Sequence, residues 1–91
     1  MSILFYSPWH DRHEWLKEIK KKFKNKHVVT LQDKPDLSKI KCAIIWDLPN
    51  AIYRKLNDVK LLFSTGAGVD HILNMPSYNN VPIIRLKDAY I

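Results

Sequence analysis

The chain has 91 residues, of which 46% are hydrophobic, and it carries 15 Lys and Arg against 9 Asp and Glu. This length supports one hydrophobic core and excludes a two-domain enzyme with its own cofactor domain, because domains usually hold roughly 100–200 residues. Three Trp, four Tyr and three Phe provide more apolar surface than disordered chains carry, and no apolar run approaches the roughly 20 residues that span a bilayer.

Strand and helix signals alternate from one end of the sequence to the other. Strands are indicated by short runs of apolar and β-branched residues, and helices by apolar residues spaced three or four apart. The predicted strands, in chain order, cover residues 3–6, 27–31, 42–46, 61–65 and 81–86. The predicted helices cover residues 11–26, the segment from Pro49 to residues 57–58, and residues 70–75. Strands that alternate with helices form right-handed βαβ units and therefore predict a parallel sheet.

The positive charge is concentrated in the first predicted helix. Residues 11–26 hold seven basic and three acidic side chains, which is +4 of the net charge of +6. Asp11, with Glu14 three positions later, is expected to cap this helix. Its apolar side chains form one stripe: Trp15, Leu16, Ile19 and Phe23. No aromatic residue lies among the lysines, as base stacking would need, so we expect a solvated helix and neither a nucleic-acid nor a membrane partner.

The number and order of the elements favour a flavodoxin-like α/β fold, which is a doubly wound parallel sheet of about five strands. Such a sheet normally ends in a helix, whereas this sequence stops at residues 88–91 without one. We therefore expect the fold to be truncated before its closing helix. Part of one sheet face would then lie bare and could associate with another copy of the chain.

One cysteine is present, Cys42, and it lies in the apolar run of residues 42–46. A single cysteine cannot form an internal disulfide, and residues 1–6 lack the basic segment and the small-residue cleavage site of a secretory signal. A reducing compartment is therefore expected, and we predict a cytoplasmic protein.

Residues 61–73 carry the strongest functional signal, because a strand enters a turn with two glycines and a helix follows at once. Main-chain N–H groups at such a turn, beside a helix N-terminus, favour an anion. A nucleotide fingerprint is not formed, since the third glycine of G-x-G-x-x-G would fall at His71 and no P-loop lysine follows. Asp70 is expected to cap the short helix, and His71 to lie on its surface.

Two segments together resemble a known family. Residues 66–73 (GAGVDHIL), followed by residues 81–88 (VPIIRLKD), are similar to the substrate domain of the D-isomer-specific 2-hydroxyacid dehydrogenases. Residues 3–6 and 43–49 look most like the glyoxylate/hydroxypyruvate reductase branch of that family. The resemblance extends over essentially the whole chain, and the Gly-Ala-Gly-Val-Asp loop is its most specific part.

The resemblance implies a substrate site and a reaction. In the family, the loop after the fourth strand binds the substrate carboxylate through consecutive main-chain amides, which match Ala67 and Gly68 here. Trp46 matches a position that lines the substrate pocket, although a tryptophan in a strand is also typical of a core. The family reaction transfers a hydride between NAD(P) and a 2-hydroxyacid or 2-oxoacid, so a small carboxylate of this kind is the implied partner.

The sequence also departs from the family. The dinucleotide-binding domain and the catalytic Arg, acidic residue and His lie beyond this region in the family, and none of those motifs is present here. We therefore expect residues 1–91 to be a partial substrate-binding domain without the dinucleotide-binding domain. It would contain no catalytic, cofactor-binding or metal-binding residue, and it would be inactive alone.

Two other functions remain open at this point. A stand-alone flavodoxin-like module could keep only the carboxylate site. A receiver-like signalling domain shares the sheet order and would use polar residues that follow three strands: Asp47, Ser64 with Thr65, and Lys87. Its Mg²⁺ site would need a carboxylate pair after the first strand, where the sequence has Ser7-Pro8.

Overall fold

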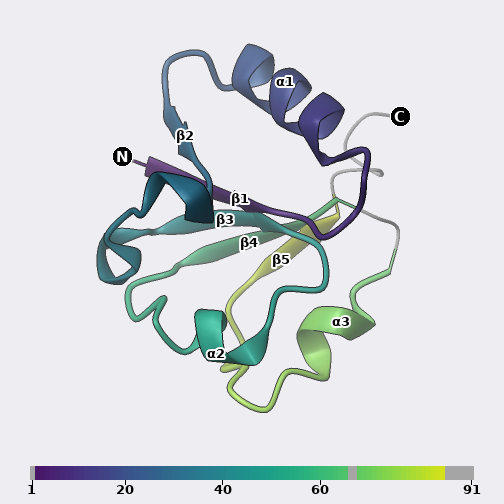
Figure 1. The fold of residues 1–91 in the computed structure, drawn as a ribbon. Coiled ribbons are helices and arrows are strands. Elements are labelled where there is room, and N and C mark those ends of the chain that lie inside the picture. Colours follow the sequence, from purple (N-terminus) through teal and green to yellow (C-terminus); the bar gives the residue numbers. More distant parts are fainter. Residues whose placement is uncertain (1, 66–67, 86–91) are drawn as a thin grey trace.

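The computed structural model describes residues 2–65 and 68–85, which fold around one five-stranded sheet (Figure 1). All neighbouring strands pair in parallel, in the order β2-β1-β3-β4-β5. The strands are β1 (Ser2–Tyr6), β2 (His27–Val29), β3 (Cys42–Ile45), β4 (Leu61–Ser64) and β5 (Ile83–Arg85). The helices are α1 (Arg12–Lys22), α2 (Asn50–Tyr53), α3 (Asp70–Leu73) and the 3₁₀ helices η1 (Leu31–Asp33) and η2 (Leu37–Lys39). This is the flavodoxin-like order, and the predicted α/β fold class is confirmed.

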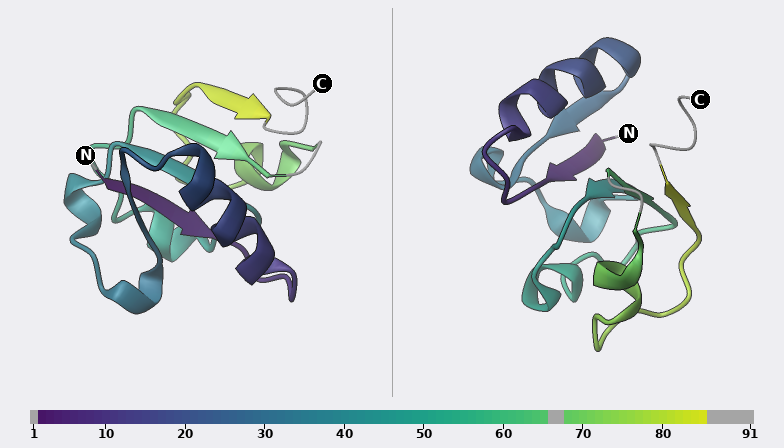
Figure 2. Two further views of the ribbon diagram at one scale, coloured as in Figure 1. Left: turned by 90° about the horizontal axis from the view of Figure 1, so that it is seen from above. Right: turned by 90° about the vertical axis from the view of Figure 1, so that its right-hand side faces the viewer.

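The helices lie on both faces of the sheet, with α1 on one face and α2 and α3 on the other (Figures 1 and 2). Side chains alternate along a strand, so neighbouring residues of β1 contribute to different layers. Ile3 and Phe5 pack against Ile19 of α1, whereas Leu4 packs with Ile72 of α3. The alternation in sequence therefore determines which helix each residue meets.

Each face of the sheet has its own hydrophobic cluster. The cluster beneath α1 consists of Ile3, Phe5, Ile19, Val28, Cys42 and Ile44. The larger cluster on the other face consists of Leu4, Val29, Ile40, Ala43, Ile45, Leu48, Tyr53, Leu56, Val59, Leu62, Ile72, Met75 and Val81. All four residues of β3 are buried because both clusters cover this strand. A continuous apolar run predicts such a strand, and here it stands in the centre of the sheet.

The two short helices end earlier than the sequence predicts. α2 ends at Tyr53, and the chain continues in tighter turns in which the Leu56 N–H donates to the Tyr53 carbonyl at 2.9 Å. α3 ends at Leu73, and the Met75 N–H donates to the carbonyl of Ile72 at 3.1 Å. Bonds over three residues tighten the last turn of a helix, and they bring Leu56 and Met75 into the core.

Neither predicted side-chain cap forms. Asp11 does occupy the N-cap position of α1, but its side chain makes no capping bond; its carbonyl instead accepts the N–H groups of Glu14 and Trp15 at 3.1 and 3.2 Å. α3 begins at Asp70 itself, and Val69 is the N-cap residue. The expectation that Asp70 caps this helix is therefore wrong, because its carboxylate lies within the first turn, where it still complements the helix dipole.

The connection between β2 and β3 contains the two 3₁₀ helices, which are not predicted from the sequence. Asp33 accepts the Thr30 N–H at 2.9 Å, and Asp36 accepts the N–H and the hydroxyl of Ser38 at 3.1 and 2.6 Å. The two hydrogen bonds from Ser38 lower the pKa of Asp36. Short polar side chains thus replace the missing backbone ladder in this connection.

In the parts of the chain that the structure describes, no helix is long and apolar enough to cross a membrane.

Candidate functional site

The candidate site lies where the carboxyl ends of β3 and β4 meet. Ile45 and Ser64 are paired in register, so the residues that follow these strands leave the sheet side by side. Trp46 extends the ladder by one bond, since its N–H donates to the Tyr6 carbonyl at 3.0 Å. In parallel α/β sheets, ligands bind outside this edge. The predicted site residues Trp46 and Gly68 both belong to the segments that leave the sheet here.

The Trp46 ring lies between two other rings at this edge. Its centroid is 4.2 Å from that of His71, at an interplanar angle of 49°, and 5.9 Å from that of Trp9, which meets it edge-on at 87°. Trp46 is half-buried and belongs to neither of the two hydrophobic clusters, and Trp9 is 52% exposed. The Trp46 side chain therefore lies at the rim of the sheet rather than in the core.

His71 connects the segments that follow β3 and β4. Its Nδ1 lies 3.0 Å from the main-chain N of Asp47, and its Nε2 lies 3.1 Å from the Ser64 hydroxyl oxygen. The same hydroxyl donates to the Gly68 carbonyl at 2.9 Å. The expectation that His71 lies on the surface of the helix is wrong: the side chain turns toward the sheet edge and is half-buried against Trp46.

Burial lowers the pKa of His71 below its ordinary value of 6.5. The carboxylate of Asp47, the Gly68 carbonyl and the carboxylate of Asp70 act in the opposite direction, but their effect is smaller than that of desolvation. The imidazole is therefore neutral at neutral pH, and one of its nitrogens is free to accept a hydrogen bond.

Gly68 lies on the open side of this edge. Its φ angle is not in the positive region, and a Cβ added to it would meet no heavy atom within 4 Å. Neither backbone strain nor packing of the described residues thus requires a glycine at this position. The glycine leaves free space in front of its main chain, as a ligand that approaches the backbone needs. The other predicted amide, that of Ala67, lies outside the described residues.

Asp47 adopts a left-handed backbone conformation, with φ at 52°, directly after Trp46. Aspartate tolerates this region better than most residues, and the resulting turn points its N–H toward His71.

Within residues 2–65 and 68–85, no three His, Cys, Asp or Glu side chains are grouped closely enough to hold a metal ion. The described residues thus offer no support for a receiver-like Mg²⁺ site beside Asp47, and Lys87 lies outside them.

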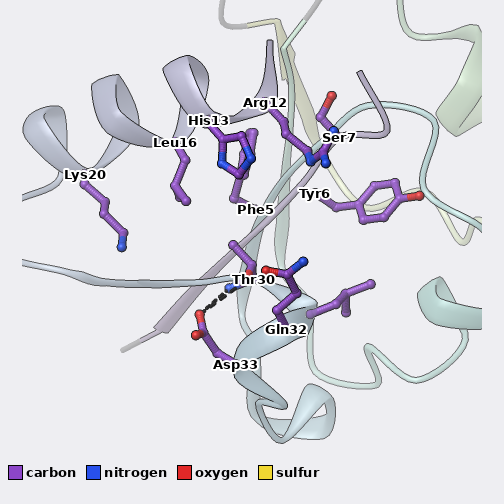
Figure 3. A pocket seen from close by; sticks show the side chains of 11 residues that line it. Phe5, Tyr6, Ser7, Arg12, His13, Leu16, Lys20, Thr30, Gln32 and Asp33 are labelled. Atoms are coloured by element: carbon purple, nitrogen blue, oxygen red, sulfur yellow. Dashed lines mark hydrogen bonds between the residues drawn. The ribbon is translucent and has the colours of Figure 1, made fainter. Parts of the chain in front are cut away.

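A separate pocket of about 330 Å³ lies between α1 and η1, at the carboxyl ends of β1 and β2 (Figure 3). Figure 3 shows the Arg12 side chain beside Ser7, and Asp33 on the opposite wall, bonded to Thr30. The pocket is lined by Phe5, Tyr6, Ser7, Arg12, His13, Leu16, Lys20, Thr30, Leu31, Gln32 and Asp33. The basic residues of α1 are expected from the sequence to form a solvated face, and this hollow is not predicted. Its lining carries charges of both signs.

The described residues do not fit a dinucleotide. The third glycine of the fingerprint allows the helix to pack closely against the strand, and here the His71 side chain occupies that position and packs on Trp46.

Comparison with known sequences gives one consistent set of relatives. No protein-family model matches the sequence. The glyoxylate/hydroxypyruvate reductase A of Serratia proteamaculans is 30% identical over 97 residues, which cover 98% of this chain and 30% of the relative. The corresponding protein of Yersinia enterocolitica is 27% identical over the same shares of the two chains. The chain thus spans about 30% of the length of the curated relatives it matches.

Solved structures give the same result. The NADPH-dependent glyoxylate/hydroxypyruvate reductase of Sinorhizobium meliloti, in complex with NADP and sulfate, has a TM-score of 0.76 and 30% identity over 92% of this chain and 28% of its own. A probable 2-hydroxyacid dehydrogenase of Rhizobium etli, in complex with NADP, HEPES and L(+)-tartaric acid, has a TM-score of 0.71 and 27% identity over 92% and 27%.

A D-isomer specific 2-hydroxyacid dehydrogenase of Xanthobacter autotrophicus shares the fold, with a TM-score of 0.76 and 22% identity over 92% of this chain and 28% of its own. The predicted resemblance is thereby confirmed: in sequence and in fold this chain is similar to part of the D-isomer-specific 2-hydroxyacid dehydrogenases, and its relatives carry the name of their glyoxylate/hydroxypyruvate reductase branch.

Proposed function

We propose that this chain is the substrate-binding portion of an NAD(P)-dependent 2-hydroxyacid dehydrogenase of the glyoxylate/hydroxypyruvate reductase type. In this proposal, main-chain N–H groups of residues 66–70, those of Ala67 and Gly68 above all, bind the carboxylate of a 2-oxoacid. The observation that carries the proposal is the junction of Trp46, His71 and Gly68 at one edge of the sheet. Trp46 packs on His71 there, and His71 contacts the hydroxyl that is bonded to the Gly68 carbonyl.

The chemistry of such a site is simple. Main-chain N–H groups donate to carboxylate oxygens, and these charge-assisted bonds are stronger than bonds between neutral groups. Trp46 would form an apolar wall that excludes water on one side of the bound molecule. One loop and one ring close only part of a cleft, so we expect weak binding by this chain alone.

We further propose that residues 1–91 form only part of a substrate-binding domain and do not transfer hydride by themselves. The nicotinamide cofactor would be held by a dinucleotide-binding domain outside this sequence, since the described residues do not fit it. The bound NADP in the neighbouring structures supports a nicotinamide cofactor for the whole enzyme. The tartaric acid in one of them supports a small hydroxyacid as its ligand.

A second partner in the proposal is another copy of the chain. Phe63 and Ile84 are paired in register and thus lie side by side on the α1 face of the sheet. Phe63 contacts Phe23 of α1 at a centroid distance of 6.5 Å, whereas Ile84, on the edge strand beyond it, is 41% exposed. Self-association through this apolar strip would remove it from water.

The carboxylate site is tested by titrating the isotopically labelled chain with oxalate, a two-carbon dicarboxylate that cannot be reduced by hydride. We expect the amide signals of Ala67 and Gly68 and the indole signal of Trp46 to move together in NMR spectra and to saturate at millimolar oxalate. Sodium chloride at matched ionic strength is the control for general electrostatics. Equal shifts with chloride, or shifts confined to the lysines of α1, would contradict the proposed site.

A further inference from the structure

We propose that His71 is a positioning residue. Its neutral imidazole, protonated on Nε2, joins the segment after β3 to the segment after β4 and thereby holds Trp46 and Gly68 at their relative positions. The consequence for ligand binding rests on the proposed function. The connection itself can be measured without any ligand.

The hydrogen bonds around His71 have only one consistent direction. The main-chain N–H of Asp47 can only donate, so Nδ1 must accept and carries no proton. In a neutral imidazole the proton is then on Nε2, which donates to the hydroxyl oxygen of Ser64 at 3.1 Å. That hydroxyl in turn donates its own hydrogen to the Gly68 carbonyl at 2.9 Å. A single chain of hydrogen bonds therefore runs from the main chain after β3 to the main chain after β4.

Each end of this chain of bonds is held by the fold. Ser64 is the last residue of β4 and is wholly buried, and Ile72, next to His71, is also wholly buried in the larger core. Asp47 directs its N–H to the ring through a left-handed turn, which is an uncommon conformation for a residue with a side chain. The last main-chain bond between the two segments runs from the Thr65 N–H to the Ile45 carbonyl at 3.3 Å, and the imidazole adds a side-chain bridge beyond it.

Protonation of His71 would break this connection at one point. A proton on Nδ1 would face the N–H of Asp47, so that two donors would oppose each other. The charged groups that act on the ring are the carboxylates of Asp47, from the segment after β3, and of Asp70, on α3. Ser64, from β4, and Trp46 contribute no charge. Acid is therefore expected to release the Asp47 amide while Ser64 stays bonded to Gly68.

The first experiment measures the ring itself in the free chain. Long-range proton–nitrogen NMR correlations at neutral pH should show His71 with its proton on Nε2. On acidification the amide signals of Asp47 and Gly68 should titrate with the His71 ring at one common midpoint, below the ordinary value of 6.5. A proton on Nδ1 at neutral pH, or an Asp47 amide that does not follow the ring, would overturn the proposal.

Two variants separate positioning from mere packing. His71→Asn places an amide oxygen near the position of Nδ1, so the Asp47 amide should stay bonded and lose its dependence on pH. His71→Phe keeps a ring against Trp46 but removes both hydrogen bonds, so the Asp47 and Gly68 amides should shift while the core signals do not. His10→Asn, at an exposed position before α1, is the matched control and should leave all of these signals unchanged.

Oxalate titration of the same variants gives the functional readout. His71→Phe should weaken oxalate binding about tenfold, roughly the effect of one lost hydrogen bond, whereas His71→Asn should bind nearly as well as the parent chain. Equal affinity of His71→Phe and the parent would overturn the positioning role. Absence of oxalate binding in every variant would count against the proposed function alone, because the ring and amide spectra decide the connection independently.

Discussion

Single residues at the carboxyl edge of the sheet acquire their roles from neighbours that are distant in sequence. Trp46 follows a strand whose four residues are all buried, yet its own ring lies at the rim between Trp9 and His71. His71 belongs to a helix of only four residues, and 24 positions separate it from Asp47, whose N–H it accepts. Within the described part of this edge, Gly68 has open space in place of a side chain.

The space in front of Gly68 leads to the first prediction. Gly68→Ala should leave the free energy of unfolding within about 0.5 kcal/mol of the parent value, because a Cβ meets no described atom and φ is not positive. The same methyl group should obstruct a ligand at the main chain and abolish the oxalate-dependent shifts. Urea denaturation and NMR titration measure the two effects. Asn57→Ala, in an exposed turn at the opposite edge of the sheet, is the control, and retained oxalate binding by Gly68→Ala would contradict the site.

Cys42 leads to a prediction on reactivity. Burial raises the pKa of its thiol to about 11, so the reactive thiolate is scarce at neutral pH. Iodoacetamide should therefore modify Cys42 slowly in the folded chain and completely in denaturing urea, as followed by intact mass. Modification at the same rate in both conditions would show that Cys42 is not protected by the fold.

At the scale of the elements, the sheet depends on how completely each strand is covered. β3 and β4 lie between two layers of side chains, whereas Ile84 and Arg85 of β5 are exposed on opposite faces of the sheet edge. A pair of reciprocal hydrogen bonds ties the beginning of α2 to the turn after α3: Asn50 donates to the Ser77 hydroxyl at 3.2 Å and accepts the Ser77 N–H at 3.0 Å. The short helices are thus held by side chains and by the core, since four residues are too few for a stable helix alone.

The different burial of Leu62 in β4 and Leu73 in α3 predicts different losses of stability when each is replaced by alanine. Leu62→Ala should lower the free energy of unfolding by about 2–5 kcal/mol, because Leu62 is wholly buried at the centre of the larger cluster. Leu73→Ala removes the same atoms from a side chain that is 51% exposed and should cost less than about 0.5 kcal/mol. Urea denaturation of both variants provides the comparison. Similar losses for the two would mean that Leu62 is not in the core that the structure shows.

At the scale of the whole molecule, two properties follow from the arrangement of layers. Helix α1 lies across one side of the sheet, and β5 forms one edge (Figure 2). Phe63 and Ile84 form an apolar strip on the α1 face, and Ile84 belongs to the edge strand. The second property is a sensitivity to acid, since the carboxyl edge is held by a histidine that is neutral in the folded state.

The exposed strip predicts concentration-dependent association. Sedimentation velocity should show a rising average mass as the parent chain is concentrated, and Ile84→Lys should keep the chain monomeric by placing a charge on the edge strand. Lys55→Ala, an exposed position on the other side of the molecule's core, changes the net charge without touching the strip and controls for charge effects. A parent chain that stays monomeric at every concentration would refute self-association.

The acid sensitivity has a defined sign. The pKa of His71 is lowered in the folded state. Below about pH 6.5 the unfolded chain therefore binds more protons than the folded chain, and the free energy of unfolding decreases as the pH is lowered. The loss should begin near the ordinary histidine pKa and be complete below the lowered one. Urea midpoints measured across this range should decline for the parent and decline less for His71→Asn. Identical pH profiles for the two would exclude His71 as the cause.

Much of this protein could be read from its sequence, because the signals involved are local. Short runs of apolar and β-branched residues indicated five strands, and the alternation of strands and helices indicated a parallel α/β sheet, which the observed strand order confirms. The motif of residues 66–73 indicated the family resemblance that the relatives confirm. Periodicity and turn residues act within a few positions of one another, so a single chain displays them directly.

Only the tertiary structure decided the ends of α2 and α3, the two 3₁₀ helices and the role of His71. α2 and α3 end where a tighter turn brings Leu56 and Met75 into the core. The helix propensities of the residues do not reveal this choice, because it depends on the position of the core. The contacts of His71 exist because sheet pairing brings the ends of β3 and β4 together across a gap in sequence. The physical reason is that a hydrogen bond between distant segments is determined by the packing of the whole sheet, and no residue carries that information alone.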